Sequence, residues 1–569
     1  MRLVEIRDLD GPNIFLLQPA IKLELDVTEA DLTSDAIATL AAGLEPLAPS
    51  DDERAAGSGG LGDLLLAACA DLHERAGVEF PEMRWVEMET PGHWSLAFGW
   101  ERRRFALGVA RLLGAAVTGE DVDPLSGVDR LRDLLQADTD NPDDRPGMIR
   151  DEDRTIPVIA VTGTNGKTTT TRFIAHILRG AGRKVGWTST VGVFIEGENV
   201  LEGDYTGPAG AWRVLREPEL DVAVLESARG GILQRGLACE TNDISVMINV
   251  SGDHLGLHGV LTVEGLARVK GVVPRTTRPD GWIVLNADDP LVRGQAAGLH
   301  APIIWVTQDP ENPTVVSHRH AGGRAVVAEE GWLIEARGED AHQVARFEDM
   351  PITLGGLAQH MIENALCAAA ATLALGVSRE EVGQGLRTFG AEAEDNLGRL
   401  HIYDLNDATV ILDYAHNEVG LRHLLALARA NVRGDGQLIS IIGTAGDRTD
   451  DALREIGRIA AEQTDRVIVK ETRRYLRGRE SVDEMTALYL EGLAAGGNPP
   501  HTVAANEPEA LEIVLRDLQP GDAVAMMCIE SGPESRARVE ELGGRSREPG
   551  AEGRGSTITA HPSSRSGGR

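Results

Sequence analysis

A glycine-rich segment between residues 163 and 169 carries the residue types that bind a nucleotide phosphate. It consists of Gly163, Thr164, Asn165, Gly166, Lys167, Thr168 and Thr169. Glycine lets backbone N–H groups approach phosphate oxygens at a helix N-terminus, where the helix dipole favours an anion. Lys167 can reach the terminal phosphates, and the Thr168 hydroxyl can ligate Mg²⁺. The segment therefore predicts a site for a nucleoside triphosphate and Mg²⁺.

The residues on either side of this loop predict the elements that position it. Val158–Val161 is a short apolar run typical of a buried strand. After the loop, apolar residues recur at helical spacing, at Phe173, Ile174, Ile177 and Leu178. An ordinary glycine turn would not require the strand, the glycines, the Lys-Thr pair and the helix in this order. We therefore expect a phosphate loop between a strand and a helix.

The glycine spacing differs from that of the general P-loop, whose first glycine lies five residues before the second. That position is Val161 here, and the loop reads GTNGKTT. In this respect the chain resembles the Mur ligase superfamily, whose members form amide bonds with ATP. The resemblance implies ATP and Mg²⁺ as cofactors. A GTPase or a small-molecule kinase is the alternative.

Length and composition set outer bounds. A chain of 569 residues is too long for one hydrophobic core and suggests three or four domains. Its net charge of −33 argues against nucleic acid and anionic membranes as partners, because both need a basic surface. The four cysteines lack metal-like or disulfide spacing and fit a reducing cytoplasm. We find neither a signal peptide nor an apolar run long enough to span a bilayer.

Shifts in composition divide the chain into four parts. Residues 1–145 end in a polar linker rich in Pro and Asp, and residues 543–569 lack apolar residues and are expected to be disordered. Residues 146–396 and 397–542 alternate strand and helix patterns, typical of parallel α/β sheets. With the resemblance, this predicts an α/β protein: a Mur-ligase-like P-loop ATPase domain and a C-terminal Rossmann-like ligase domain, preceded by a small α+β N-terminal domain.

Glu226 is the first candidate metal ligand outside the loop. It follows the predicted buried strand 221–225, and open α/β sheets place ligands at the carboxyl ends of their strands. A carboxylate there can hold Mg²⁺ or a metal-bound water, or it can pair with Arg229 on the surface. Residues 203–208 and 221–237 are similar to segments of the cyanophycin synthetases, a branch of the superfamily. Arg229 is a candidate substrate contact.

Two more candidates follow in the chain. Asp253 and His254 end the next predicted strand, and in Mur ligases the matching histidine helps to hold a magnesium ion. A histidine in such a place can also be a satisfied structural group. Lys270 matches a lysine that many members carbamylate, and the alternative is a plain lysine paired with a phosphate or an acid. The resemblance thus implies Lys167, Glu226, His254 and Lys270 as catalytic residues.

The other end of the nucleotide is assigned by resemblance to later segments. The family uses an asparagine such as Asn364 near the adenine, and Arg399 and Asp413 match positions near the phosphates and the ribose. Arg399 and Asp413 could instead be surface charges. His416 and Asn417 complete the loop after Asp413 and are candidate substrate contacts.

These parts permit one reaction in particular. A carboxylate attacks the γ-phosphate of ATP, ADP leaves, and an amine captures the acyl phosphate to form an amide. The expected partners are an amino acid and a carboxylate-bearing peptide or small molecule, and we expect a homo-oligomer. The alternatives are a catalytically weak companion subunit that binds ATP or peptide, and a P-loop kinase.

Two departures from the cyanophycin synthetases bear on the substrates. Those enzymes carry an ATP-grasp domain between an N-terminal domain like residues 1–145 and their Mur-like half, so this chain should perform at most one of their two ligations. They also have an acidic stretch where Arg473 and Arg474 stand here. Guanidinium groups recognise carboxylates, which predicts an amine substrate with an extra carboxylate. A polyanionic acceptor or a solvated face would also explain these arginines.

Overall fold

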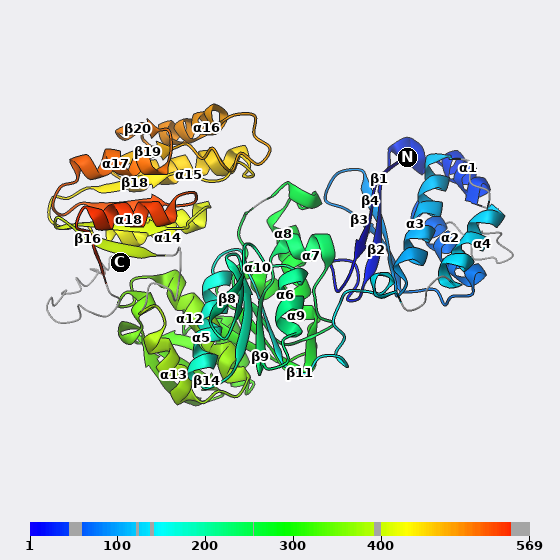
Figure 1. The fold of residues 1–569 in the computed structure, drawn as a ribbon, viewed down its shortest axis with the longest axis horizontal. Helices are drawn as coiled ribbons and strands as arrows, with labels where there is room; N and C mark the ends of the chain where they lie inside the picture. Colours follow the sequence, from blue (N-terminus) through cyan, green and yellow to red (C-terminus); the bar gives the residue numbers. More distant parts are fainter. Residues whose placement is uncertain (45–59, 121–123, 137–140, 254, 392–399, 548–569) are drawn as a thin grey trace, which may run out of the picture.

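The chain folds into three domains in a row (Figure 1). The structure, a computed structural model, describes residues 1–44, 60–120, 124–136, 141–253, 255–391 and 400–547. The N-terminal domain, drawn in blue, and the C-terminal domain, drawn in yellow to red, lie on either side of the central domain. None of the helices in these ranges combines the length and the apolar composition needed to cross a membrane.

The N-terminal domain is a small antiparallel sheet covered by helices. Its described strands run in the order β1 (Arg2–Leu9), β2 (Ala20–Asp26), β4 (His93–Gly99) and β3 (Met83–Glu87). Alternate residues of β2, including Ile21 and Leu23, are buried against the helices. These helices are α1 (Ser34–Leu44), α2 (Leu61–Ala76), α3 (Arg103–Thr118) and α4 (Pro124–Gln136). The predicted α+β character is confirmed.

The central domain is built on a long sheet that is parallel in its middle. The described strands have the order β15 (Asp340–Arg346), β14 (Trp332–Arg337), β13 (Arg324–Glu329), β12 (Ile303–Thr307), β11 (Thr277–Asn286), β10 (Asn242–Met247), β5 (Val158–Thr162), β9 (Val222–Glu226), β6 (Val185–Ser189), β7 (Gly192–Ile195) and β8 (Glu198–Glu202). Pairing is parallel from β13 to β6 and antiparallel at both edges. The predicted strand 158–161 is β5, which lies between β10 and β9 in the parallel part of this sheet.

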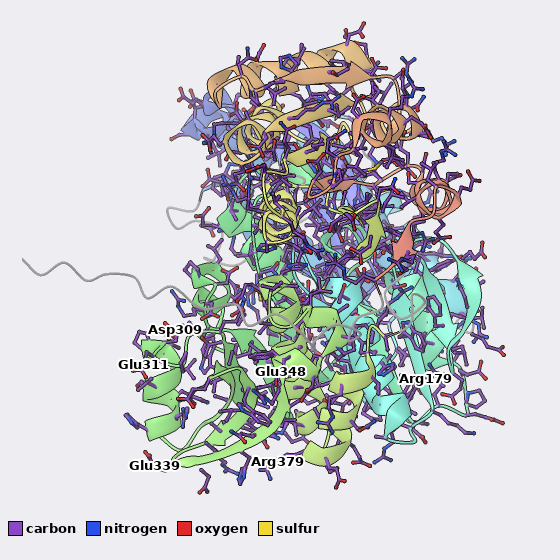
Figure 2. The ribbon with its side chains drawn as sticks, turned by 90° about the vertical axis from the view of Figure 1, so that its left-hand side faces the viewer. Arg179, Asp309, Glu311, Glu339, Glu348 and Arg379 are labelled. Atoms are coloured by element: carbon purple, nitrogen blue, oxygen red, sulfur yellow. The ribbon has the colours of Figure 1, made fainter. Side chains whose placement is uncertain are left out.

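Helices cover both faces of the central sheet. One face packs against α5 (Lys167–Gly180), α12 (Gln359–Ala374) and α13 (Arg379–Thr388). The other packs against α6 (Pro208–Leu215), α7 (Arg229–Arg235), α8 (Val263–Lys270), α9 (Val272–Arg275), α10 (Pro290–Gly294) and α11 (Pro313–His320). Figure 2 shows Glu339 and Arg379 at the end of this domain that faces away from the C-terminal domain.

The C-terminal domain repeats this architecture on a smaller scale. Its described strands have the order β20 (His501–Ala504), β19 (Arg466–Lys470), β18 (Leu438–Ile442), β21 (Ala523–Met527), β17 (Ala408–Asp413), β16 (His401–Leu405) and β22 (Arg545–Ser546). One face packs against α14 (Glu418–Arg429), α15 (Asp450–Gln463) and α16 (Val482–Ala495), and the other against α17 (Glu507–Asp517) and α18 (Gly532–Glu541).

The predicted start of the disordered tail, at residue 543, is too early in the chain. Residues 543–547 were assigned to it, but β22 pairs with β16. The Arg547 N–H donates to the Ile402 carbonyl over 2.8 Å, and its guanidinium donates to Asn431 over 2.6 Å. Polar backbone and side-chain bonds thus order a segment that has few apolar residues. Residues 548–569 lie outside the described part of the chain.

Candidate functional site

The phosphate loop lies between β5 and α5, as the sequence predicts. Gly166 adopts a left-handed conformation with φ of 82°. A Cβ added there would lie 2.2 Å from Oδ1 of Asn364, so glycine is required by backbone conformation and by space. Nζ of Lys167 folds back over the loop and donates to the Thr164 carbonyl over 2.8 Å.

Asn249, which follows β10, and Lys270, at the end of α8, hold the loop in place. Oδ1 of Asn249 accepts hydrogen bonds from the N–H groups of Thr164 (3.2 Å) and Asn165 (2.9 Å). Nζ of Lys270 donates to the Gly163 carbonyl over 2.6 Å. Asn249 was not predicted, although a polar residue just after a buried strand was the available signal. Its role depends on β10 lying beside β5, which spacing along the chain does not reveal.

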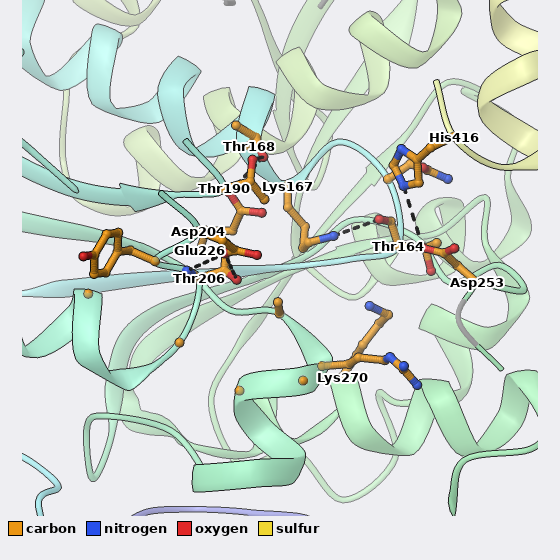
Figure 3. Close-up of a pocket in the computed structure, with 18 of the residues that line it drawn as sticks. Thr164, Lys167, Thr168, Thr190, Asp204, Thr206, Glu226, Asp253, Lys270 and His416 are labelled. Atoms are coloured by element: carbon orange, nitrogen blue, oxygen red, sulfur yellow. Dashed lines mark hydrogen bonds and ion pairs between the residues drawn. The ribbon is translucent and has the colours of Figure 1, made fainter. Parts of the chain in front are cut away.

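Three oxygen-bearing side chains meet at the start of α5 (Figure 3). The Thr168 hydroxyl donates to Oε2 of Glu226 over 2.9 Å and lies 3.2 Å from the Thr190 hydroxyl. Hydroxyl and carboxylate oxygens suit Mg²⁺, which commonly binds one or two carboxylates together with substrate phosphates and water. The donor set therefore fits a magnesium ion bound with a nucleotide. Thr190 was missed, because it becomes a neighbour only through the pairing of β6 with β9.

The rest of the expected metal site is less complete. Among the described residues, no group of three or more His, Cys, Asp or Glu side chains is arranged to hold a metal ion. His254 lies outside the described residues. Asp253, its neighbour, is buried and pairs with a residue of the C-terminal domain: Nη2 of Arg448 lies 3.2 Å from Asp253 Oδ1. Glu226 and the two threonines thus form the described part of the site.

Lys270 is buried at the end of α8 with 3% of its surface exposed. Burial, followed by repulsion from Lys167, holds the pKa of this amine well below its usual value. The only partner that its hydrogen bonds give within the described residues is the Gly163 carbonyl. This partner is a backbone carbonyl and neither a phosphate nor an acid, and the geometry does not test carbamylation.

A cavity of about 700 Å³ opens between the central and C-terminal domains. Its lining includes most of the predicted site residues, namely Thr164, Asn165, Gly166, Lys167, Thr168, Thr169, Glu226, Arg229, Lys270 and His416. Two contacts join the domains beside it. Nδ2 of Asn417 donates to Oδ1 of Asn165 over 3.0 Å, and Nε2 of His416 lies 3.9 Å from Oδ2 of Asp253. The phosphate loop therefore faces the C-terminal domain across one shared space.

The arginines of the C-terminal domain are placed differently from the expectation. Arg473 and Arg474 do not line the cavity; Arg473 pairs with Glu471 and its side chain is 62% exposed. Arg477 and Arg448 line it instead. Nη1 of Arg477 lies 2.7 Å from a carboxylate oxygen of Asp447. Local ion pairs, which spacing does not predict, decide which arginines face the cavity.

A second cavity, of about 60 Å³, lies on the other side of the loop. Asn364 and Asp413 line it, and their places near the adenine and the ribose stay predictions. Two histidines that also line it stack on each other across the domain boundary: the rings of His360 and His423 are 4.9 Å apart with an interplanar angle of 6°. Arg399 lies outside the described residues.

A phosphate loop at the carboxyl edge of a doubly wound sheet, facing a second α/β domain, is the arrangement of the P-loop class of nucleotide-binding proteins. Residues 161–372 match the Mur ligase middle domain, and residues 398–528 match the Mur ligase, glutamate ligase domain. The chain belongs to the Mur ligase family, and the predicted resemblance is confirmed.

Two curated relatives illustrate the similarity. The chain is 30% identical over 379 residues to the UDP-N-acetylmuramoyl-L-alanyl-D-glutamate--2,6-diaminopimelate ligase of Gloeobacter violaceus, covering 66% of this chain and 72% of that protein. It is 41% identical over 388 residues to the cyanophycin synthetase of Crocosphaera subtropica, covering 68% of this chain. The match spans only 43% of that synthetase.

Solved structures share the fold. E. coli FolC in complex with DHPP and ADP superposes with a TM-score of 0.50 at 19% identity, covering 68% of this chain and 89% of FolC. A pseudomurein peptide ligase type C from Methanothermus fervidus gives a TM-score of 0.50 at 19% identity, covering 72% of this chain and 84% of that one. The predicted fold class is confirmed.

Proposed function

We propose that the chain is an ATP-dependent amide ligase that activates a carboxylate as an acyl phosphate and couples it to an amine, with release of ADP and phosphate. The single observation that carries this proposal is the shared cavity, lined by the phosphate loop on one side and by Arg448 and Arg477 of the C-terminal domain on the other. The names of the two curated relatives, an amino-acid ligase and a polymer synthetase, agree with it.

ATP and Mg²⁺ are the proposed cofactors. Mg²⁺ would supply positive charge at the transferring phosphoryl group. Thr168, Thr190 and Glu226 are the residues that would hold it. Lys167 would leave the Thr164 carbonyl and contact the terminal phosphates, where its charge favours the transition state. Lys270 would keep the Gly163 carbonyl fixed, which makes it a positioning residue in its uncarbamylated form.

The C-terminal domain would protect the acyl phosphate from water. Contacts of Asn417 with Asn165 and of Arg448 with Asp253 bring the two domains together over the phosphate loop. A closed cavity limits hydrolysis of a reactive intermediate and fixes the amine near its target.

The acidic-amine hypothesis now depends on Arg477. Of the arginines in the segment 473–479, it is the one that lines the cavity. Its side chain is 48% exposed and its guanidinium pairs with Asp447, so a substrate carboxylate would join an existing ion pair. We propose an amine substrate with an extra carboxylate, recognised by Arg477 rather than by Arg473 and Arg474.

The chain would perform one ligation. Only residues 137–157 separate α4 from β5, which leaves no room for an ATP-grasp domain between the N-terminal and central domains. We therefore propose that this protein alone makes no aspartate–arginine polymer. A homo-oligomeric state and a cytoplasmic location remain predictions.

One assay separates the candidate functions. Purified protein is incubated with Mg²⁺, ATP, and pools of amino acids and carboxylates, and ADP release is measured. Release that depends on both an amine and a carboxylate supports the ligase. Nucleotide binding without turnover supports the companion subunit, and a stable phosphorylated product supports a kinase. If the protein proves to be a ligase, ADP release that arginine or lysine stimulates far more than any acidic amino acid would refute the role of Arg477.

A further inference from the structure

A carboxylate of the N-terminal domain, Glu89, contacts the start of α8 in the central domain. Glu89, in the turn between β3 and β4, accepts hydrogen bonds from the N–H groups of Leu261 (2.6 Å) and Thr262 (2.9 Å). Its other oxygen accepts from the Thr262 hydroxyl over 2.9 Å and pairs with Arg268. The Glu89 side chain is 17% exposed. This carboxylate therefore caps the start of α8 from another domain.

The sequence of α8 is adapted to this contact. Gly265 lies in the first turn of the helix, where the N–H of Gly265 donates to the Thr262 hydroxyl over 3.0 Å. A Cβ at position 265 would lie 1.8 Å from Oε1 of Glu89. Glycine weakens a helix relative to alanine, so its presence here is explained by the space that the carboxylate occupies.

A negative charge on Glu89 is favourable at the start of α8. Burial alone would raise its pKa, but hydrogen bonds from the Leu261 and Thr262 N–H groups and the charge of Arg268 hold the pKa below its usual value. An anion at a helix N-terminus is stabilised by the helix dipole and by the unpaired N–H groups there.

The other end of α8 is part of the proposed active site. Lys270 is the last residue of the helix, and its Nζ donates to the Gly163 carbonyl at the start of the phosphate loop. Glu89 thus contacts the N-terminal end of α8, and Lys270 lies at its C-terminal end. Residues 1–160 lie outside both matched Mur ligase domains, so those matches do not account for Glu89.

We propose that Glu89 is a positioning residue of the ligase: the N-terminal domain fixes α8 through this carboxylate, and α8 in turn holds Lys270 against the phosphate loop. This inference rests on the proposed function for its effect on turnover. The proposal can also be tested without substrates, because the contacts from Glu89 through α8 to the phosphate loop are present in the ligand-free chain.

The domains are joined by a second contact that does not involve α8. The Asp10 N–H donates to the Arg235 carbonyl over 2.7 Å, and the Leu237 N–H donates to the Pro12 carbonyl over 2.8 Å. Removal of the Glu89 side chain therefore leaves these backbone bonds available to keep the N-terminal domain docked. The effect of the cap can be measured apart from the effect of docking.

The test uses Glu89→Ala, Gly265→Ala and the double variant in the full chain. We expect each single variant to speed amide hydrogen exchange both in residues 263–270 and in residues 163–168, without substrates present. Where the parent releases ADP, we expect kcat to fall about tenfold or more with a change in the KM for ATP below about threefold, as expected of a displaced group.

The double variant isolates the contact between the two side chains. The three atoms nearest to the methyl group added by Gly265→Ala all belong to the Glu89 side chain, so the double variant should be no worse than Glu89→Ala. Glu82→Ala is the matched control: Glu82 pairs with Arg84 on the surface of the same domain, and its removal should change neither exchange nor kcat.

Two results would overturn the proposal. One is faster exchange in residues 263–270 with unchanged exchange in residues 163–168, which would make Glu89 a structural cap only. The other is a kcat within twofold of an active parent in Glu89→Ala. If the parent releases no ADP with any substrate pair, the proposed function fails, while the exchange experiment still decides the link from Glu89 to the loop.

Discussion

The central domain meets its two neighbours in different ways. Toward the C-terminal domain, the contacts are single polar side chains around a cavity, such as Asn417 with Asn165. Toward the N-terminal domain, backbone groups pair directly and pack without space: a Cβ on Gly11 would lie 1.9 Å from the Leu237 carbonyl oxygen. The first interface suits closure over ligands, and the second suits a fixed support. We therefore call the interface with the C-terminal domain the adjustable boundary and the interface with the N-terminal domain the rigid boundary.

The largest effect is expected at the cavity side of this comparison. Lys167→Ala and Glu226→Ala should each lower ADP formation by at least about 100-fold, because each removes a group that contacts the phosphates or their metal ion. Circular dichroism and the melting temperature should stay close to those of the parent. Turnover near the parent rate in either variant would remove the site assignment.

These two residues were also the ones that the sequence predicted best. Lys167 lies within a contiguous motif, and Glu226 ends an apolar run, so local pattern was sufficient. Thr190 and Asn249 were missed because they join the site only through the strand order β10-β5-β9-β6. Arg473 was misplaced because its direction depends on the ion pair with Glu471. Local chemistry can be inferred from sequence, whereas pairing between distant segments cannot.

The two α/β domains were likewise predictable, and their interfaces were not. Alternating strand and helix patterns give a parallel sheet wherever they occur. The N-terminal interface depends on single close approaches, such as those of Gly11 to Leu237 and of Glu89 to Gly265. In a sequence, each of these glycines is indistinguishable from a turn residue, so nothing marks it as a contact.

The rigid boundary can be broken by one methyl group. Gly11→Ala should lower the free energy of unfolding by about 2 kcal/mol, because the new Cβ overlaps the Leu237 carbonyl and overpacking typically has this cost. Chemical denaturation of the ligand-free chain measures the loss. Gly294→Ala is the control, since a Cβ there meets no atom within 4 Å. Equal stability of Gly11→Ala and Gly294→Ala would mean that the boundary is looser than described.

A buried carboxyl group at the adjustable boundary predicts that the stability of the folded state depends on pH. Glu363 lines the smaller cavity and accepts a hydrogen bond from Nδ2 of Asn249 over 2.6 Å. Burial raises its pKa to about 7 from 4.5 in the unfolded chain. The folded state therefore holds this proton more tightly, so its contribution to stability is complete below about pH 4.5 and is lost as the pH rises through about 7.

Glu363→Gln should remove this dependence. Glutamine keeps an acceptor for Asn249 without a charge, so the variant should be more stable than the parent at pH 8 by roughly 1–2 kcal/mol, less than the full shift because part of the side chain is exposed. The difference should vanish near pH 4.5. Denaturation curves at the two pH values measure it, and an equal difference at both would contradict the titration of Glu363.

The smallest effect is expected where the adjustable boundary depends on one hydrogen bond. Asn417 has two roles: Nδ2 donates to Asn165 in the phosphate loop, and Oδ1 accepts from the Gly420 N–H over 2.8 Å as the N-cap of α14. Asn417→Ser keeps the cap but is too short to reach Asn165, whereas Asn417→Ala loses both.

We expect the serine variant to lower kcat/KM by roughly two- to tenfold, since one such bond contributes about 0.5–1.5 kcal/mol, with little change in melting temperature. The alanine variant should show the same kinetic loss and, in addition, about 1 kcal/mol less stability. Parent kinetics in the serine variant would show that closure does not use this bond, and the comparison between the two boundaries would then depend on the other contacts, such as that of Arg448 with Asp253.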